Sequence, residues 1–508
     1  IIMLGGRIGK DGIHGATFSS VALDENSPVS AVQIGDAIMQ KRMFDFLWEA
    51  KKEDLYTCIT DNGAGGLSSS VGEMAEFSNG AKLHLDKAPL KYQGLQPWEI
   101  LISEAQERMT VSVPPEKVDR FLELSEKMQV ESTVLGDFTD SGYFECYYDG
   151  KLVAQLEMDF MHKGVPPMLL EAEWIPPKRA SGMPEEPADL GKLLHTILGR
   201  PNVCSKESVI RQYDHEVQGG SVVKPLTGAA NDGPSDAGVI RPVLDTMEGI
   251  AISNGICPRY SLIDTYHMTA CAIDEAIRNV IAVGGSLKQI AGLDNFCWPD
   301  PVESDHTPDG KYKLAQLVRS CMAIYDYCTG FGVPCISGKD SMKNDANLDG
   351  QKISILPTLL FSAIGKIEDV RKCVTSDVKK PGDLIYVIGN TLDECGASEY
   401  YQEIGFEGGE VPKVQLATAK QRYQKITEAT EKGLIKSNHD CSDGGLAVAM
   451  AEIAFGGRLG LSVDLEGLTE KQKLRSDSLL FSESQSRFVL TIDKKDQNQF
   501  ESIMADDD

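Results

Sequence analysis

The sequence contains no long apolar segment, few basic residues and no closely paired cysteines. No run of apolar residues approaches the roughly 18 needed to cross a bilayer, so we expect no membrane span. Its 50 Lys and Arg residues stand against 76 Asp and Glu residues, which leaves a net charge of −26. Such a surface repels a phosphodiester backbone, which argues against nucleic acid as a partner. A nucleotide held through Mg²⁺ is compatible with it, because carboxylates bind the metal and the metal binds the phosphates.

The 12 cysteines are scattered and include no C-x-x-C pair. In a chain of 508 residues this pattern predicts reduced, mostly buried thiols and a cytoplasmic protein. Cys321, Cys328 and Cys335 are spaced by seven, but no histidine lies nearby, so we interpret them as small buried residues rather than metal ligands. The first residues include no charged leader or cleavage site. Because the chain lacks an initial Met and stops soon after an apolar segment at 488–492, we expect it to be part of a longer protein.

Two stretches of the chain repeat one pattern at one spacing. Asp61–Leu67 reads Asp-Asn-Gly-Ala-Gly-Gly-Leu, and Asp440–Leu446 reads Asp-Cys-Ser-Asp-Gly-Gly-Leu. A Glu-x-Gln-x-Arg motif begins 43 residues after each aspartate, at Glu104 and at Glu483, and another glutamate follows each aspartate by 12 residues. Chance does not produce so many fixed offsets. The chain therefore contains one module twice, with the copies 379 residues apart.

We expect about three domains, as the length suggests. The two copies should occupy residues 1–175 and 380–508, with a connector at 176–232 and a different domain at 233–370. Periodicity predicts strands and helices that together indicate α/β or α+β domains. The expected strands are near 108–113, 131–136, 142–147, 151–157, 248–253, 287–292, 353–361 and 384–389. The expected helices begin after Gly66 and lie near 118–124, 189–198, 265–283 and 311–330.

Each Asp-x-x-x-Gly-Gly-Leu motif is typical of a glycine-rich turn that opens a helix. Two glycines allow backbone N–H groups to approach an anion closely, and the preceding aspartate suits Mg²⁺ or a hydrogen bond to the turn. The alternative is that Asp61 and Asp440 only cap a helix. Their fixed distance from the Glu-x-Gln-x-Arg motif favours a functional role in at least one copy.

Two further motifs carry hydrogen-bonding groups. Glu104 and Gln106 should point to one side of an extended chain and suit a sugar or an amide, unless they only form a solvated strand start. In the run Ser-Gly-Lys-Asp-Ser, Gly338 frees the backbone, and Lys339 with Ser341 suits phosphate. The alternative there is a surface turn. The run lacks the upstream glycine of a P-loop, so we reject that motif.

Acidic and amide side chains of the middle domain suit Mg²⁺. Glu275 and Asn279 lie four residues apart and share one face of the long expected helix, although such pairs are commonly just solvated. Asp236 and Asp294 are further acidic residues of this domain. Asp294 follows an expected strand, a position as common for helix caps as for metal ligands. His439 lies beside the second copy's aspartate, but no nucleophile is near it. Covalent catalysis is therefore not expected.

The segment Gly5–Phe18 resembles phosphoribosylformylglycinamidine synthase, the amidotransferase family of purine biosynthesis. Asp61–Leu67, Glu104–Met109, Gly338–Met342 and Asp440–Leu446 agree with that family in order and spacing, over essentially the whole chain. The resemblance implies tandem domains similar to aminoimidazole ribonucleotide synthetase, in the order A1, B1, A2, B2. This chain would hold B1, A2 and a truncated B2, with A1 absent.

The implied reaction is an ATP-dependent conversion of formylglycinamide ribonucleotide to its amidine, with ammonia from glutamine. ATP phosphorylates the amide oxygen, and ammonia then displaces phosphate. Mg²⁺ and fixed donors would stabilise the transferring phosphoryl group. The implied partners are the ribonucleotide, a glutaminase domain or subunit, and A1. Because the catalytic histidine belongs to A1, we expect no catalytic residue here, an inactive isolated chain and an exposed face of the A2 sheet.

By motif match, the resemblance also implies roles for single residues. Substrate contacts are implied for Gln33, Glu104, Gln106 and Ser341. Magnesium is implied at Asp61, and ATP near Asp294 and Gly338. Longer family members hold an auxiliary ADP or ATP, whose Mg²⁺ ligands here would be Asp236, Glu275, Asn279 and Asp440, with Ser235 and Ser442 near the nucleotide. Two departures are Ala105, where Ser is frequent, and Lys339-Asp340, where shorter members carry Asn-Val, which leaves metal contact by residue 339 open.

Two alternatives remain. Another ATP-using enzyme of the superfamily, such as aminoimidazole ribonucleotide synthetase or selenophosphate synthetase, is the first, although such chains usually carry one domain pair. The second is a non-catalytic scaffold that holds a nucleotide and docks a glutaminase.

Overall fold

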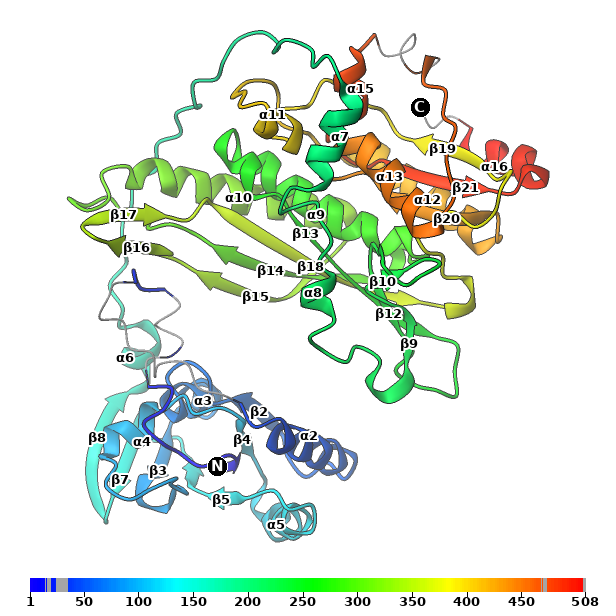
Figure 1. The fold of residues 1–508 in the computed structure, drawn as a ribbon. Coiled ribbons are helices and arrows are strands. Elements are labelled where there is room, and N and C mark those ends of the chain that lie inside the picture. The colour runs from blue at the N-terminus through cyan, green and yellow to red at the C-terminus, as the bar shows by residue number, and fades with distance from the viewer. Residues whose placement is uncertain (14, 16–19, 24–34, 467, 469–472, 506–508) are drawn as a thin grey trace. The chain divides into compact units, whose positions relative to one another are not determined.

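The computed structural model describes residues 1–13, 15, 20–23, 35–466, 468 and 473–505. The chain forms two compact units (Figure 1). The first comprises Ile1–Leu169 with Asn344–Ile353, and the second comprises Leu170–Lys343 with Ser354–Asp508. None of the helices in the described ranges is both long enough and apolar enough to cross a membrane.

The first unit contains two four-stranded sheets. One has the order β2-β4-β1-β5, with every neighbouring pair antiparallel, and the other has the order β6-β3-β7-β8. The strands are β1 (Ile2–Gly5), β2 (Cys58–Asp61), β3 (Ala81–His84), β4 (Arg108–Ser112), β5 (Ser132–Val134), β6 (Gly136–Phe138), β7 (Tyr143–Tyr148) and β8 (Lys151–Glu157). The expected strands of this copy are thus confirmed within a few residues. The hairpin of β16 (Asp345–Leu348) and β17 (Gln351–Ser354) is also assigned largely to this unit.

Helices of the first unit bury one apolar stripe each. The N-cap of α2 is Asp36, which accepts a hydrogen bond from the Met39 amide, and the helix buries Phe46. Phe46 meets Phe121 of α5 edge to face, with ring centres 4.9 Å apart. These helices thereby cover the sheet that carries the Asp-x-x-x-Gly-Gly-Leu turn. The helices are α2 (Ala37–Lys52), α3 (Leu67–Ala75), α4 (Pro97–Ile102), α5 (Val118–Lys127) and α6 (Met158–Lys163).

The second unit is built on a six-stranded sheet of order β15-β14-β18-β13-β12-β9. Helices α9 (Thr265–Ala282) and α10 (Gly310–Phe331) lie along one face of it (Figure 1). The strands are β9 (Ser221–Val223), β12 (Gly238–Ile240), β13 (Gly249–Ile256), β14 (Ile290–Cys297), β15 (Cys335–Ser341) and β18 (Thr358–Ile367), and a short pair joins β10 (Leu226–Thr227) to β11 (Gly233–Pro234). The strand expected near 353–361 therefore begins later, after the hairpin, because residues 355–357 separate β17 from β18.

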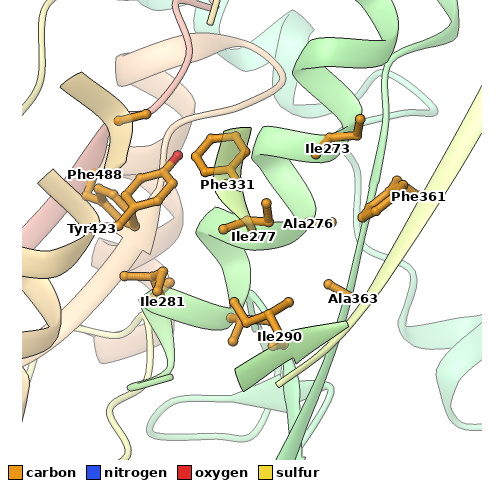
Figure 2. Packing of buried hydrophobic residues seen from close by; sticks show 14 of the residues in the cluster. Ile273, Ala276, Ile277, Ile281, Ile290, Phe331, Phe361, Ala363, Tyr423 and Phe488 are labelled. Atoms are coloured by element: carbon orange, nitrogen blue, oxygen red, sulfur yellow. The ribbon is translucent and has the colours of Figure 1, made fainter. Parts of the chain in front are cut away.

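Helix α9 is the shared centre of the second unit's largest core. Ile277 and Ile281 lie toward Tyr423 and Phe488 of the second module copy, and Phe361 of the sheet lies on the other side (Figure 2). Helix α9 is buried on nearly all sides, and its buried residues include the polar Asp274, Arg278 and Asn279 as well as apolar side chains. This packing fixes the polar residues of α9 relative to the second copy.

The second copy repeats the sheet of the first. Its three strands, β19 (Leu384–Ile388), β20 (Ile435–Asp440) and β21 (Phe488–Ile492), have the antiparallel order β19-β21-β20, which matches β1-β4-β2. Its helices are α11 (Glu399–Glu403), α12 (Leu416–Glu431), α13 (Gly445–Gly457), α15 (Ser476–Phe481) and α16 (Gln497–Met504). The duplication read from sequence offsets is therefore also a duplication of structure.

The segment expected to be a connector contributes to the second unit. Helix α7 (Leu190–Leu198) buries Leu193 and Ile197 against the second copy, and β9 pairs with β12 at the sheet edge. A short helix, α8 (Glu207–Ile210), lies between them. Sequence reasoning missed β9 because three residues are too few to show a period.

The face of the six-stranded sheet opposite α9 and α10 carries exposed isoleucines. Ile252 of β13 pairs with Ile364 of β18, and the two side chains are 52% and 39% exposed. Ile336 on the edge strand β15 is 66% exposed. An apolar face of this kind is unusual for a surface that meets only water.

Candidate functional site

A cavity of about 520 Å³ in the second unit is lined by all six residues that the sequence assigned to the auxiliary nucleotide. It lies among the loop after β11, helix α9, the end of β20 and the connector. Six of the predicted residues line it: Ser235, Asp236, Glu275, Asn279, Asp440 and Ser442. They are up to 207 positions apart in sequence, so the fold alone brings them together.

In two of the predicted ligands, one polar side-chain atom is hydrogen-bonded to the protein and one oxygen has no partner in the described structure. Oδ1 of Asp236 accepts hydrogen bonds from the Asp440 amide at 3.0 Å and from His439, whereas its buried Oδ2 has no partner in the described structure. The Nδ2 of Asn279 donates to the Asn254 carbonyl at 3.3 Å, and its buried Oδ1 likewise has none. Buried oxygens are rarely orphaned, so this arrangement suits a cation.

In the other two predicted ligands, Glu275 and Asp440, one carboxylate oxygen accepts hydrogen bonds from the protein. Oε2 of Glu275 accepts from the Ile256 amide at 2.9 Å, and Oδ2 of Asp440 accepts from the guanidinium of Arg278 at 3.1 and 3.2 Å. Burial, together with the charge of Asp440, raises the pKa of Glu275 to about 7. Burial also raises the pKa of Asp440 to about 6, although Arg278 opposes that shift. Oxygen ligands at this density fit Mg²⁺, which takes carboxylate oxygens together with substrate phosphates.

His439 is a member of this site that sequence reasoning missed. Its Nδ1 lies 2.8 Å from Oδ1 of Asp236, and its Nε2 lies 2.9 Å from Oε2 of Glu452 on α13. Burial alone would lower the pKa of His439, but the charges and hydrogen bonds of both carboxylates raise it well above the usual value. For Asp236 the directions are reversed. Burial would raise the pKa of this carboxyl, but the charge of His439 and the hydrogen bond from it keep that pKa below its usual value. The signal available in the sequence was the shared 12-residue offset of Glu452 from Asp440.

Arg278 was not singled out from the sequence either. It is fully buried on α9, and its guanidinium contacts Asp274 at 2.5 Å, Asp440 and, at 3.1 Å, Oε1 of Gln485. Arg278 therefore joins the long helix of the middle domain to both motifs of the second copy. Figure 2 shows the apolar packing of the same helix.

The glycine-rich turns have the geometry that the motif predicted. Gly65 and Gly66 have φ of +78° and +57°, and Gly444 and Gly445 have φ of +77° and +67°. The N-caps of α3 and α13 are Gly66 and Gly444, without a side-chain cap, so neither aspartate caps its helix. Asp61 instead accepts from the Gly63 amide at 2.7 Å and is exposed.

The Glu-x-Gln-x-Arg motifs form the same local structure in both copies. Glu104 accepts from the Gly65 amide at 3.2 Å, and Glu483 accepts from the Gly444 amide at 2.8 Å. Arg108 and Arg487 are buried, and each donates to the backbone carbonyls three and five residues before it. In each copy the arginine therefore stabilises the loop that carries the glutamate and the glutamine. Gln106 is exposed, and Gln33 lies outside the described residues.

We expect Gly445→Ala to destabilise the second unit. A Cβ at this position would lie 2.4 Å from the Ser482 carbonyl oxygen, and a left-handed φ strains any residue with a side chain. The free energy of unfolding should fall by on the order of 1–3 kcal/mol in a denaturant titration. Gly460→Ala is the matched control, because no atom lies within 4 Å of its Cβ position. Equal stability of the two variants would contradict the assigned turn.

The residues predicted near ATP lie on two neighbouring strands rather than on a turn. Gly338 of β15 is in register with Asp294 of β14, and a Cβ on Gly338 would lie 3.0 Å from the Asp294 carboxylate. Burial, with a contribution from Asp340, raises the pKa of Asp294. Lys339 donates to the Ser341 hydroxyl at 3.1 Å. Because side chains alternate along a strand, Ser341 faces the side of the sheet opposite Gly338.

The surface-turn interpretation of this motif is therefore wrong, since β15 is an extended edge strand. The three evenly spaced cysteines form no metal site among the described residues. The interpretation of these cysteines as buried residues holds for Cys328 alone and is wrong for Cys321 and Cys335, which are exposed. The sulfurs of Cys328 and Cys335 lie 3.8 Å apart, and all 12 cysteines are free thiols. Within the described ranges, the group of His, Cys, Asp or Glu atoms close enough to share a metal is Asp236, His439 and Asp440.

Comparison with known proteins identifies both domain types. The model of the AIR synthase related protein C-terminal domain matches residues 1–149 and 380–508, and that of the N-terminal domain matches residues 234–367. Phosphoribosylformylglycinamidine synthase subunit PurL of Thermoplasma volcanium is 34% identical and matches 100% of this chain over 65% of its own length. The same subunit of Thermococcus sibiricus is 32% identical, over 99% of this chain and 67% of its own length. The chain thus spans about two thirds of such relatives, and slightly less in the first case.

Solved structures show the same fold. T. maritima PurL complexed with FGAR has a TM-score of 0.68 at 24% identity, over 97% of this chain and 68% of that chain. T. maritima PurL complexed with ADP has a TM-score of 0.63 at 24% identity, over 97% of this chain and 67% of that chain.

Proposed function

Because the chain belongs to the phosphoribosylformylglycinamidine synthase PurL family, we propose that it is part of the enzyme that converts formylglycinamide ribonucleotide to its amidine. The reaction consumes ATP, uses Mg²⁺ and takes ammonia from glutamine. The likeness to PurL, which extends over the whole of this chain, carries this proposal because it includes both domain types in one order. T. maritima PurL complexes with FGAR and with ATP support the substrate and the nucleotide.

The proposed domain order is B1 at residues 1–175, a connector at 176–232, A2 at 233–370 and an incomplete B2 at 380–508. The matched sheets β2-β4-β1 and β20-β21-β19 support two B-type domains. An A1-type domain, outside these 508 residues, is the proposed partner for the exposed isoleucine face of the A2 sheet. A glutaminase domain or subunit is the proposed ammonia source, and a cytoplasmic location agrees with the free thiols.

The cavity of the second unit is the proposed site of the auxiliary Mg²⁺–nucleotide. Asp236, Glu275, Asn279 and Asp440 would hold the metal, with Ser235 and Ser442 beside the nucleotide. Mg²⁺ bound there neutralises phosphate charge. This assignment is supported by Oδ2 of Asp236 and Oδ1 of Asn279, which are buried and have no hydrogen-bond partner in the described structure. The metal role of Asp61 in the first copy, and the ATP roles of Asp294 and Gly338 in the middle domain, are further proposals that rest on the resemblance of their motifs to the family.

Substrate contacts are proposed for Glu104, Gln106 and Gln33 of the first copy. A substrate contact is also proposed for Ser341, which lies on β15 of the middle domain. The counterparts in the second copy are occupied by the protein. Glu483 accepts from the Tyr260 hydroxyl at 2.7 Å and from the Gly444 and Glu399 amides, and Gln485 is buried against Arg278. This closure favours a second candidate role for the second copy alone, a scaffold that holds a nucleotide without turning it over.

The test of this function is reconstitution with a separately produced A1-type domain. With ATP, Mg²⁺, ammonia and formylglycinamide ribonucleotide, the isolated chain should yield no amidine by chromatography and mass spectrometry, and the mixture should yield it. Amidine from the chain alone would overturn the proposed need for A1. If neither preparation makes amidine, the proposed reaction is wrong for this chain.

Glu104→Gln should lower the rate of the reconstituted mixture by about ten- to hundredfold, because a charged hydrogen-bond acceptor for the substrate is lost. Glu116→Gln, an exposed acid of the same copy, is the control and should leave the rate unchanged. An unaltered rate for Glu104→Gln would remove that residue from the substrate site.

A further inference from the structure

His439 connects two acidic residues at the edge of the nucleotide cavity. It lies on β20, and its two ring nitrogens contact Asp236, in the loop after β11, and Glu452, on α13. The three side chains therefore link β20 and α13 to the loop after β11, which lies more than 200 residues earlier in the sequence. The His439 side chain is 7% exposed and that of Asp236 is 1% exposed, so bulk water does not compete for these bonds.

Both ring nitrogens of His439 contact carboxylate oxygens, so the ring is placed to orient Asp236. The ring fixes Oδ1 of Asp236, with help from the Asp440 amide, and leaves Oδ2 buried and without a partner in the described structure.

The first copy lacks this arrangement. Thr60 occupies the position equivalent to His439, and its hydroxyl lies 3.5 Å from Glu73, the counterpart of Glu452. A hydroxyl at that distance is a weak contact and cannot bridge two carboxylates. The bridging histidine therefore distinguishes the copy with the auxiliary cavity from the copy that carries Glu104 and Gln106.

We propose that His439 is a positioning residue of the auxiliary site, which turns Oδ2 of Asp236 toward Mg²⁺ and is itself held by Glu452. This inference rests on the proposed Mg²⁺–nucleotide function of the cavity. Residues that orient metal ligands commonly alter metal affinity by about 10–100-fold when they are replaced. The effect should fall on the metal and spare nucleotide binding measured without metal.

Two amide variants separate the two contacts of the ring. In His439→Asn the amide nitrogen lies near the position of Nδ1, so the bond to Asp236 is kept and that to Glu452 is lost. In His439→Gln the amide nitrogen lies near the position of Nε2, so the bond to Glu452 is kept and that to Asp236 is lost. Each protein is first stripped of bound nucleotide in EDTA. ADP is then titrated calorimetrically into it at a series of Mg²⁺ concentrations and in EDTA.

We expect the Mg²⁺ concentration for half-maximal ADP binding to rise about tenfold or more in His439→Gln, and less than threefold in His439→Asn. Equal shifts in the two variants, or none in either, would overturn the positioning role. If His439→Gln does not fold, His439→Thr replaces it as the test, because Thr60 stands at this position in the first copy, and it should raise the required Mg²⁺ concentration about tenfold or more. An unshifted His439→Thr would overturn the role equally.

The outcomes separate this inference from the proposed function. Wild-type protein that binds no ADP at any Mg²⁺ concentration would overturn the auxiliary site and, with it, the role of His439. Wild-type protein that binds Mg²⁺–ADP normally, alongside a His439→Gln variant with the same Mg²⁺ dependence, would overturn only the role of His439.

Discussion

Purified chain should release a stoichiometric amount of ADP or ATP on denaturation, and the double variant Asp236→Asn, Asp440→Asn should release none. Both residues face the 520 Å³ cavity, and Oδ2 of Asp236 is buried without a partner in the described structure. Replacing two anionic ligands by amides removes most of the charge that holds Mg²⁺, so nucleotide affinity should fall at least about a hundredfold. Chromatography and mass spectrometry of the denatured sample measure the result.

Asp232→Asn is the matched control for this experiment. Asp232 lines the same cavity but forms an ion pair with Arg458 at the surface, so it should keep its nucleotide. Circular dichroism of the double variant establishes that it is folded. A folded double variant that still carries stoichiometric nucleotide would remove these two aspartates from the site.

Arg278→Met should destabilise the second unit more than Gly445→Ala does. The guanidinium is fully buried between Asp274 and Asp440, and its removal leaves two buried carboxylates without their cation. Breaking a buried ion pair costs about 3–5 kcal/mol. The midpoint of thermal unfolding should fall by roughly 10 °C.

Two further variants test the reason for this loss. Arg278→Met combined with Asp440→Asn should recover part of the stability, because one uncompensated charge is gone. Arg120→Met removes the exposed ion pair with Glu53 in the first unit and should leave the midpoint unchanged. A midpoint for Arg278→Met equal to that of Arg120→Met would show that Arg278 is not a structural link.

Local features of the site could be predicted from sequence because they depend on neighbours along the chain. The turns at Gly65–Gly66 and Gly444–Gly445 require positive φ, which glycine adopts readily. The side chains of Arg108 and Arg487 contact carbonyls only three and five residues away. Because the motifs have the same spacing in both copies, the glycine turns and the arginine contacts have the same local structure in both.

Other features depend on residues that lie far apart, and no local pattern carries them. The contacts of His439 with Asp236 and of Tyr260 with Glu483 span 203 and 223 residues. The run at Gly338 has the composition of a turn, yet pairing with β14 makes it a strand, since hydrogen bonds to a neighbour outweigh local preference.

The sequence by itself determined the duplication, the domain types and the candidate oxygen ligands, because fixed offsets and short motifs survive without knowledge of the fold. Only the tertiary structure decided which residues share the cavity and which copy is closed. The physical reason is that burial of α9 against both the six-stranded sheet and the second copy sets the positions of Glu275, Arg278 and Asn279. Those positions bring Arg278 against Asp440 and place Glu275 and Asn279 at the cavity.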